Sequence, residues 1–104
     1  MTIGDAYERM LQAMEDVTGE ALETVHPRRT ESQYWMRTII AQHLWKMGWN
    51  DRQIGEILHR DHSTIFIARS KYRAAMELPK IYADVVRLDT NFKQRYYDFF
   101  GTDI

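Results

Sequence analysis

The stretch RDHST, Arg60 to Thr64, places polar side chains directly before an apolar helical pattern. Asp61 is a preferred residue for the N-cap of a helix, where its carboxylate can accept from backbone N–H groups two or three residues further on. The same types of side chain can read base edges in duplex DNA. A carboxylate accepts from a cytosine amino group, a His ring donates to guanine or thymine, and a hydroxyl reaches bases or phosphates. We therefore treat Asp61, His62, Ser63 and Thr64 as candidate base-reading residues, with local capping as the alternative.

Two predicted helices must position this polar stretch. Apolar periodicity predicts one helix from Asp51 to about Leu58, capped by Asn50, and a second from His62 to Leu78. Two helices separated by three residues match a helix-turn-helix, whose second helix enters the major groove with its first turn. The inward stripe of the second helix is expected to be Ile65, Ala68, Tyr72, Ala75 and Met76.

The rest of the chain also has helical periodicity, without strand alternation or internal repeats. We therefore predict one all-α, compact multi-helix domain of about six helices over residues 1–104. The four further helices are expected at Ile3–Val17, at about Gly19–Thr24 before Pro27, at Thr30–Met47 with a Thr30–Gln33 capping box, and at about Lys80–Phe100 before Gly101.

Charge is unevenly distributed along the chain, although its net value is only −1. Residues 26–80 carry ten Lys and Arg against five Asp and Glu, while residues 1–25 carry six acidic residues and one Arg. A basic middle segment between acidic flanks suits a polyanionic partner, but it can also be an ordinary solvated face.

The segment IGEILHRDHSTIFIARSKY, residues 54–72, resembles the helix-turn-helix of a known family. The family is the C-terminal, DnaA-box-binding domain of the bacterial replication initiator DnaA, here as a stand-alone domain. The residues that follow its motif without a gap are Arg60, Asp61, His62, Ser63, Thr64, Ile65, Ala68, Lys71 and Tyr72, with Ile54 and Gly55 in the preceding helix. A looser likeness extends from about Tyr7 to Arg95.

The resemblance implies a DnaA C-terminal or TrpR-like fold and a double-stranded DNA partner with an AT-rich box. It implies that Asp61, His62, Ser63 and Thr64 read the major groove, and that a basic loop places an arginine in the minor groove. Arg28 or Arg29 stands nearest to that loop position, and a solvated loop is the alternative. Cations around the motif are phosphate-binding candidates: Lys46, Arg52, Arg60, Arg69, Lys71 and Arg73.

The implied function is sequence-specific DNA binding that regulates replication initiation or transcription, without enzymatic activity or a cofactor. The sequence contains no GxxxxGK[ST] motif, so the ATPase chemistry of the full initiator is not expected. It departs from the family where Tyr34 and Trp35 replace an Arg-Gln pair, so that part of the backbone clamp is lost or has become stacking. The turn before Arg60 is also one residue shorter than in the family.

A protein-interaction module on the same scaffold is the alternative function. Its partner, or a second copy in a homodimer, would bind the acidic first helix or the aromatic C-terminal helix. Trp35, Trp45 and Trp49 belong either to the core or to such a surface. The same choice applies to the aromatic stripe Phe92, Tyr96, Phe99 and Phe100.

Other chemistry has little support in the sequence. There is no cysteine, and His59 and His62 straddle a helix break, so we expect no metal site. No apolar run approaches the roughly 18 residues of a membrane span, and the first ten residues lack the pattern of a secretory signal. We therefore expect a cytoplasmic, nucleoid-associated protein without a membrane partner.

Overall fold

The computed structural model describes residues 1–24 and 30–104, which form five α-helices and no β-strand. The predicted all-α class is confirmed, but the predicted count of about six helices is too high. The helices are α1 (Ile3–Thr18), α2 (Glu31–Lys46), α3 (Asp51–Leu58), α4 (His62–Glu77) and α5 (Ala83–Phe100).

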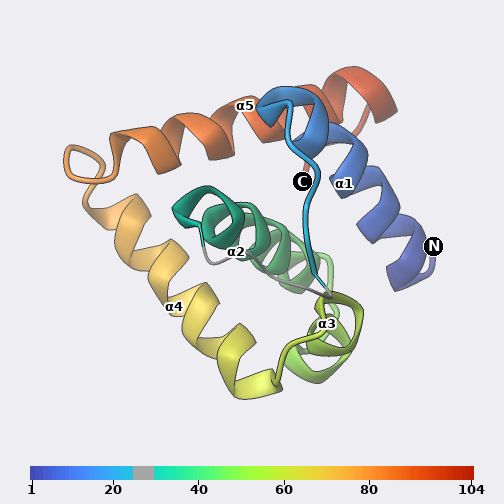
Figure 1. The fold of residues 1–104 in the computed structure, drawn as a ribbon. Helices are drawn as coiled ribbons and strands as arrows, with labels where there is room; N and C mark the ends of the chain where they lie inside the picture. The colour runs from blue at the N-terminus through green and yellow to red at the C-terminus, as the bar shows by residue number, and fades with distance from the viewer. Residues whose placement is uncertain (25–29) are drawn as a thin grey trace.

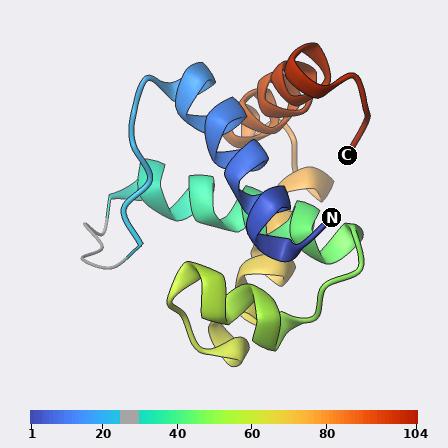
Figure 2. The ribbon, with the colours of Figure 1, turned by 90° about the vertical axis from the view of Figure 1, so that its right-hand side faces the viewer.

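Helix α2 is the centre of the fold. It contacts α1, α3 and α4, and both views show it surrounded by the other elements (Figures 1 and 2). Its buried residues lie on all sides of the helix rather than on one stripe, as expected for a helix enclosed by neighbours. They are Gln33, Trp35, Met36, Thr38, Ile39, Ile40, Ala41, His43 and Leu44.

Helices α1 and α5 pack against each other and close one side of the core. The predicted stripe of α1 faces inward, with Tyr7, Met10 and Met14 buried. Phe92 and Tyr96 of α5 are fully buried, so these two residues of the aromatic stripe belong to the core rather than to a partner surface. Phe99 keeps 39% of its surface exposed.

The short helix predicted at about Gly19–Thr24 is absent from the described residues. Gly19 has left-handed dihedrals (φ 67°), which end α1. The backbone amides that follow bind side chains instead of helical carbonyls, since Leu22 N donates to Glu15 Oε2 at 2.8 Å and Glu23 N to Gln33 Oε1 at 2.8 Å. These side-chain acceptors replace the intrahelical bonds that the sequence pattern suggested. Pro27, the predicted stop, lies outside the described residues.

Two predicted helix starts also need correction. Thr30 Oγ1 accepts from Gln33 N at 3.2 Å, as predicted, but the Gln33 side chain does not complete the capping box because it binds residues 20–23. Helix α5 begins at Ala83 rather than near Lys80. The preceding residues form a turn, in which Ile81 N and Tyr82 N both donate to Leu78 O at 3.0 Å.

A buried polar cluster joins α2, α4 and α5. Asp89 is 2% exposed, and its carboxylate binds His43 Nε2 at 2.8 Å and accepts from the Tyr72 hydroxyl at 3.0 Å. Lys93 Nζ lies 3.4 Å from the same carboxylate. Burial raises the pKa of Asp89, but the hydrogen bond and charge of His43, with Lys93 and Tyr72, outweigh it and lower the pKa. The cluster therefore holds α4 against α2 and α5 through a carboxylate that stays ionised.

We expect Asp89→Asn to lower the free energy of unfolding by about 3 kcal/mol at neutral pH, because it leaves its buried partners without their anion. The pKa of Asp89 is lower in the folded protein than in the unfolded chain, where it is near 3.8. Its carboxylate therefore stabilises the fold above pH 3.8 and loses that effect as the pH falls through the folded-state pKa. Acidification below pH 3.8 should thus reduce the free energy of unfolding less in the variant than in the wild type, as measured by denaturant titrations. The control Asp84→Asn, at an exposed pair with Arg87, should change stability little. Equal effects of the two substitutions would contradict this role.

Candidate nucleic-acid interface

The turn between α3 and α4 is held by a close backbone contact at Gly55. A Cβ atom on Gly55 would lie 2.4 Å from the carbonyl oxygen of Arg60, so only glycine fits this position. Arg60 N donates to Gly55 O at 2.8 Å. His59 ends α3 with left-handed dihedrals (φ 55°), a conformation that usually takes glycine. The short turn therefore fixes where α4 begins relative to α3.

Arg60 stabilises this turn through its side chain. Its Nη1 donates to the carbonyl oxygens of Thr24 at 2.9 Å, Leu58 at 3.2 Å and His59 at 2.9 Å. These bonds engage Nη1 and tie the segment before residue 25 to the turn between α3 and α4. Arg60 is therefore a structural residue of this turn, and a phosphate contact by it stays a prediction.

The polar tip, defined as Asp61, His62, Ser63 and Thr64, is exposed at all four residues. Asp61 occupies the N-cap position of α4, but its carboxylate makes no capping hydrogen bond with the described backbone amides. It accepts instead from the Ser63 hydroxyl, and it lies 3.3 Å from Nδ1 of His62. The Ser63 hydrogen bond, followed by the His62 ring and the nearby backbone amides, lowers the pKa of Asp61. The tip thus presents an ionised acceptor, an imidazole and a Thr hydroxyl to solvent.

The inward stripe of α4 lies largely as predicted. Ile65, Ala68 and Ala75 are buried, and Tyr72 is half-buried at the Asp89 cluster. One further residue is buried that the stripe did not include, which is Arg69.

The Arg69 side chain on α4 is enclosed by contacts with α3 and α2. Its Nε and Nη2 donate to the two oxygens of Asp51 at 2.8 Å each, and its guanidinium stacks on Trp45 at 4.4 Å from the ring centroid. The side chain is 9% exposed. Arg69 was a phosphate candidate on charge alone, and this bidentate pair removes it from that set because its charge is already neutralised.

The four remaining phosphate candidates are exposed: Lys46, Arg52, Lys71 and Arg73. Arg73 follows His62 by eleven residues, which is three helical turns, so the two lie on the same side of α4. Lys46 and Arg52 are the chain neighbours of Trp45 and Asp51, the two residues that contact Arg69 on that side. Arg28 and Arg29, the predicted minor-groove residues, lie outside the described residues.

An open groove of about 790 Å³ runs beside the tip between α2 and α4. Tyr34, Arg37, Arg60 and Thr64 line it, together with Thr30, Glu31 and Trp35. Trp35 is otherwise buried and packs edge-on against Tyr34 and Tyr82. Trp35 therefore serves the core and not a stacking platform, whereas Tyr34 remains half-exposed next to the tip.

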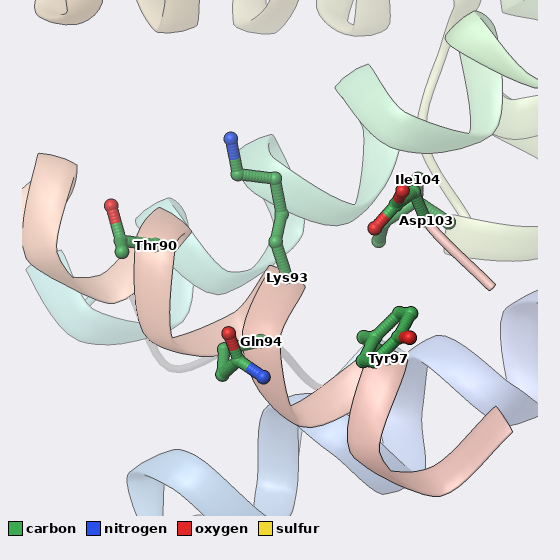
Figure 3. Close-up of a pocket in the computed structure, with 6 residues that line it drawn as sticks. All are labelled: Thr90, Lys93, Gln94, Tyr97, Asp103 and Ile104. Carbon is green, nitrogen blue, oxygen red and sulfur yellow. The ribbon is translucent and has the colours of Figure 1, made fainter. Parts of the chain in front are cut away.

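The other large pocket in the described residues lacks a comparable group of exposed polar side chains at a helix start. An open pocket of about 550 Å³ between α5 and the end of the chain contains Lys93 and Asp103 with mostly uncharged neighbours (Figure 3). Its Lys93 already pairs with Asp89.

Within residues 1–24 and 30–104, no group of three or more His, Asp or Glu side chains could hold a metal ion. The helices formed by these residues include none long and apolar enough to cross a membrane.

Comparison of the chain with protein-family models, with curated proteins and with solved structures found no match. The resemblance to the DnaA domain therefore rests on the motif residues themselves. The tip follows that motif, and the short turn with His59 in a left-handed conformation departs from it.

One feature of this face was not found by sequence reasoning. The Asp51–Arg69 pair joins residues eighteen positions apart, and nothing in their local pattern distinguishes them from other surface charges. Phe66 and Ile67, by contrast, lie outside the predicted inward stripe, and they are exposed as that periodicity predicts, at 56% and 55%.

The contact at Gly55 predicts opposite effects for two glycine substitutions. Gly55→Ala should lower the free energy of unfolding by about 1–3 kcal/mol, because its methyl group meets backbone rather than a movable side chain. Gly4→Ala in α1, whose added Cβ would meet only Thr2 Oγ1 at 3.7 Å, should raise it by up to about 1 kcal/mol. Urea unfolding of both variants measures the difference. A Gly55→Ala protein as stable as Gly4→Ala would contradict the tight turn.

Proposed function

We propose that this chain binds double-stranded DNA in a sequence-specific manner, by inserting the polar tip and the start of α4 into the major groove. The observation that carries the proposal is the exposure of all four tip residues at the end of a rigid helix pair. A tip packed against its own chain would have been unable to reach base edges. Arg73 lies on the His62 side of α4, and the exposed Lys46 and Arg52 adjoin Trp45 and Asp51, which contact Arg69; these cations would neutralise phosphates.

The tip chemistry suits recognition of base edges. The ionised Asp61 accepts a hydrogen bond from an exocyclic amino group, and the His62 ring donates to an acceptor on guanine or thymine. Because the Ser63 hydroxyl donates to Asp61, its oxygen remains an acceptor. By its resemblance to the DnaA domain, the chain would occupy AT-rich, DnaA-box-like sites and regulate replication initiation or transcription.

A protein-interaction module is the second candidate function. The exposed apolar residues on the outer face of α4, together with the internal use of Arg60 and Arg69, favour it. The two functions differ in a simple respect, since only the first requires a preferred duplex sequence.

Selection of bound duplexes from a random pool tests the proposal, and we expect enrichment of one sequence. His62→Ala should then reduce the preference for that sequence over a scrambled duplex by about 1–3 kcal/mol, because a base-reading side chain is lost. Lys71→Ala is the matched control, and it should weaken both duplexes alike because a phosphate contact carries no sequence information. Equal loss on both duplexes for His62→Ala would remove the direct-readout role, and the absence of enrichment would favour the second candidate.

The salt dependence of binding tests the proposed phosphate contacts. If the four exposed cations each neutralise one phosphate, log affinity should fall with log salt concentration at a slope of about −3.6. Substitution of Arg73 by Ala should reduce the slope by about 0.9, whereas Arg87→Ala on α5 should leave it unchanged. Fluorescence anisotropy titrations between low and moderate salt provide the measurement, and a slope near zero would contradict a phosphate-tracking surface.

A further inference from the structure

Two large apolar residues stand next to each other on the outer face of α4. Phe66 is 56% exposed and Ile67 is 55% exposed, while the opposite face of the helix is buried. Scattered single apolar residues are ordinary on protein surfaces, so exposure by itself does not define a site. The position of this pair relative to the tip gives it significance.

The pair lies one helical turn behind the tip. Phe66 follows His62 by four residues and Ile67 follows Ser63 by four, so each side chain lies above a tip residue on the same side of the helix. Four residues advance about 6 Å along the helix axis, which is less than the length of two base-pair steps of about 3.4 Å. With α4 lying along the groove, side chains at both levels can therefore reach neighbouring base pairs.

Phe66 is held in place by the arrangement around Arg69. The Arg69 guanidinium lies 5.6 Å from the Phe66 ring centroid and 4.4 Å from that of Trp45, and Asp51 binds it through both oxygens. Because Arg69 is fixed by Asp51, it restricts the Phe66 ring that it contacts. An exposed aromatic side chain that is already ordered loses little entropy when a ligand packs on it.

The surroundings of the pair suit a nucleic-acid groove better than an apolar protein partner. Its neighbours on the helix surface are polar: His62, Ser63, Thr64, Ser70 and Lys71. Other exposed large apolar residues include Leu78, Ile81, Tyr97 and Phe99 of the α4–α5 turn and α5, and Trp45 and Met47 at the end of α2. Of these, Trp45 stacks on the same Arg69 guanidinium as Phe66. On α4 itself, the pair is a small apolar patch among polar side chains. In the major groove, the thymine 5-methyl group is the apolar feature that distinguishes one base from the others.

We propose that Phe66 and Ile67 recognise thymine 5-methyl groups, and so extend base reading one turn beyond the polar tip. This inference rests on the proposed function. It assigns the preference for thymine to two residues of this chain, and it gives Arg69 a positioning role in place of a phosphate contact.

Replacement of thymine by deoxyuridine tests the proposal, because it removes the methyl group and leaves every hydrogen-bonding group in place. The probe is the duplex selected from the random pool, with each thymine replaced in turn by deoxyuridine. Loss of one buried methyl contact should weaken wild-type binding by about fourfold at one or more positions. Phe66→Ala and Ile67→Ala should each lose the sensitivity at one such position while retaining the remaining pattern. Ile81→Ala, which truncates an apolar residue that is 73% exposed in the α4–α5 turn, is the matched control and should keep the wild-type pattern.

The outcomes separate this inference from the proposed function. A wild-type protein that prefers the selected duplex but tolerates deoxyuridine everywhere would overturn the methyl contacts and leave sequence-specific binding intact. The methyl contacts would also be overturned if both variants kept the wild-type sensitivity pattern. Failure to enrich any duplex would refute the proposed function and the methyl contacts with it. Circular dichroism and thermal unfolding of each variant establish that the fold is retained, as expected for exposed positions.

Discussion

The face that α4 presents depends on one ion pair, in which Asp51 at the start of α3 binds Arg69 in the middle of α4 through two parallel hydrogen bonds. The pair is largely shielded from solvent, and such pairs contribute more to orientation than to net stability because desolvation offsets much of the attraction. By neutralising Arg69 inside the protein, it turns a basic residue into a support for Trp45 and Phe66. A charge count alone would have placed this cation on the outer surface.

The two ends of α4 are held in place by different kinds of interaction. At its start, the backbone of Gly55 touches the carbonyl of Arg60, whose guanidinium binds three further carbonyl oxygens. Toward its end, Tyr72 donates to the buried carboxylate of Asp89, which α2 also contacts through His43. Steric closeness, backbone hydrogen bonds and a buried anion together leave α4 little freedom to rotate. A polar tip on such a helix is held in one orientation, which would lower the entropy cost of the proposed binding.

The small net charge of the chain is compatible with a polyanionic partner, because the charges are unevenly distributed along the sequence. The acidic residues of the first helix lie on α1, where Asp16 pairs with Arg95 of α5, whereas exposed cations lie near α4 and the α2–α3 connection. Local potential, rather than net charge, governs the approach of DNA. The two candidate functions give the exposed apolar pair on α4 different roles, which are base recognition in the first and contact with a protein partner in the second.

The sequence by itself determined the helical class, the bounds of α3 and α4 within one residue, and the exposure of the tip, because these follow from apolar periodicity and from residues that start and end helices. It could not determine the loop at residues 19–24, where side chains of Glu15 and Gln33 capture the backbone amides that a helix would use. Nor could it show which cations are available for phosphates. That was decided by tertiary packing, because contacts between residues far apart in the chain, such as Asp51 with Arg69 and Thr24 with Arg60, leave no local pattern in the sequence.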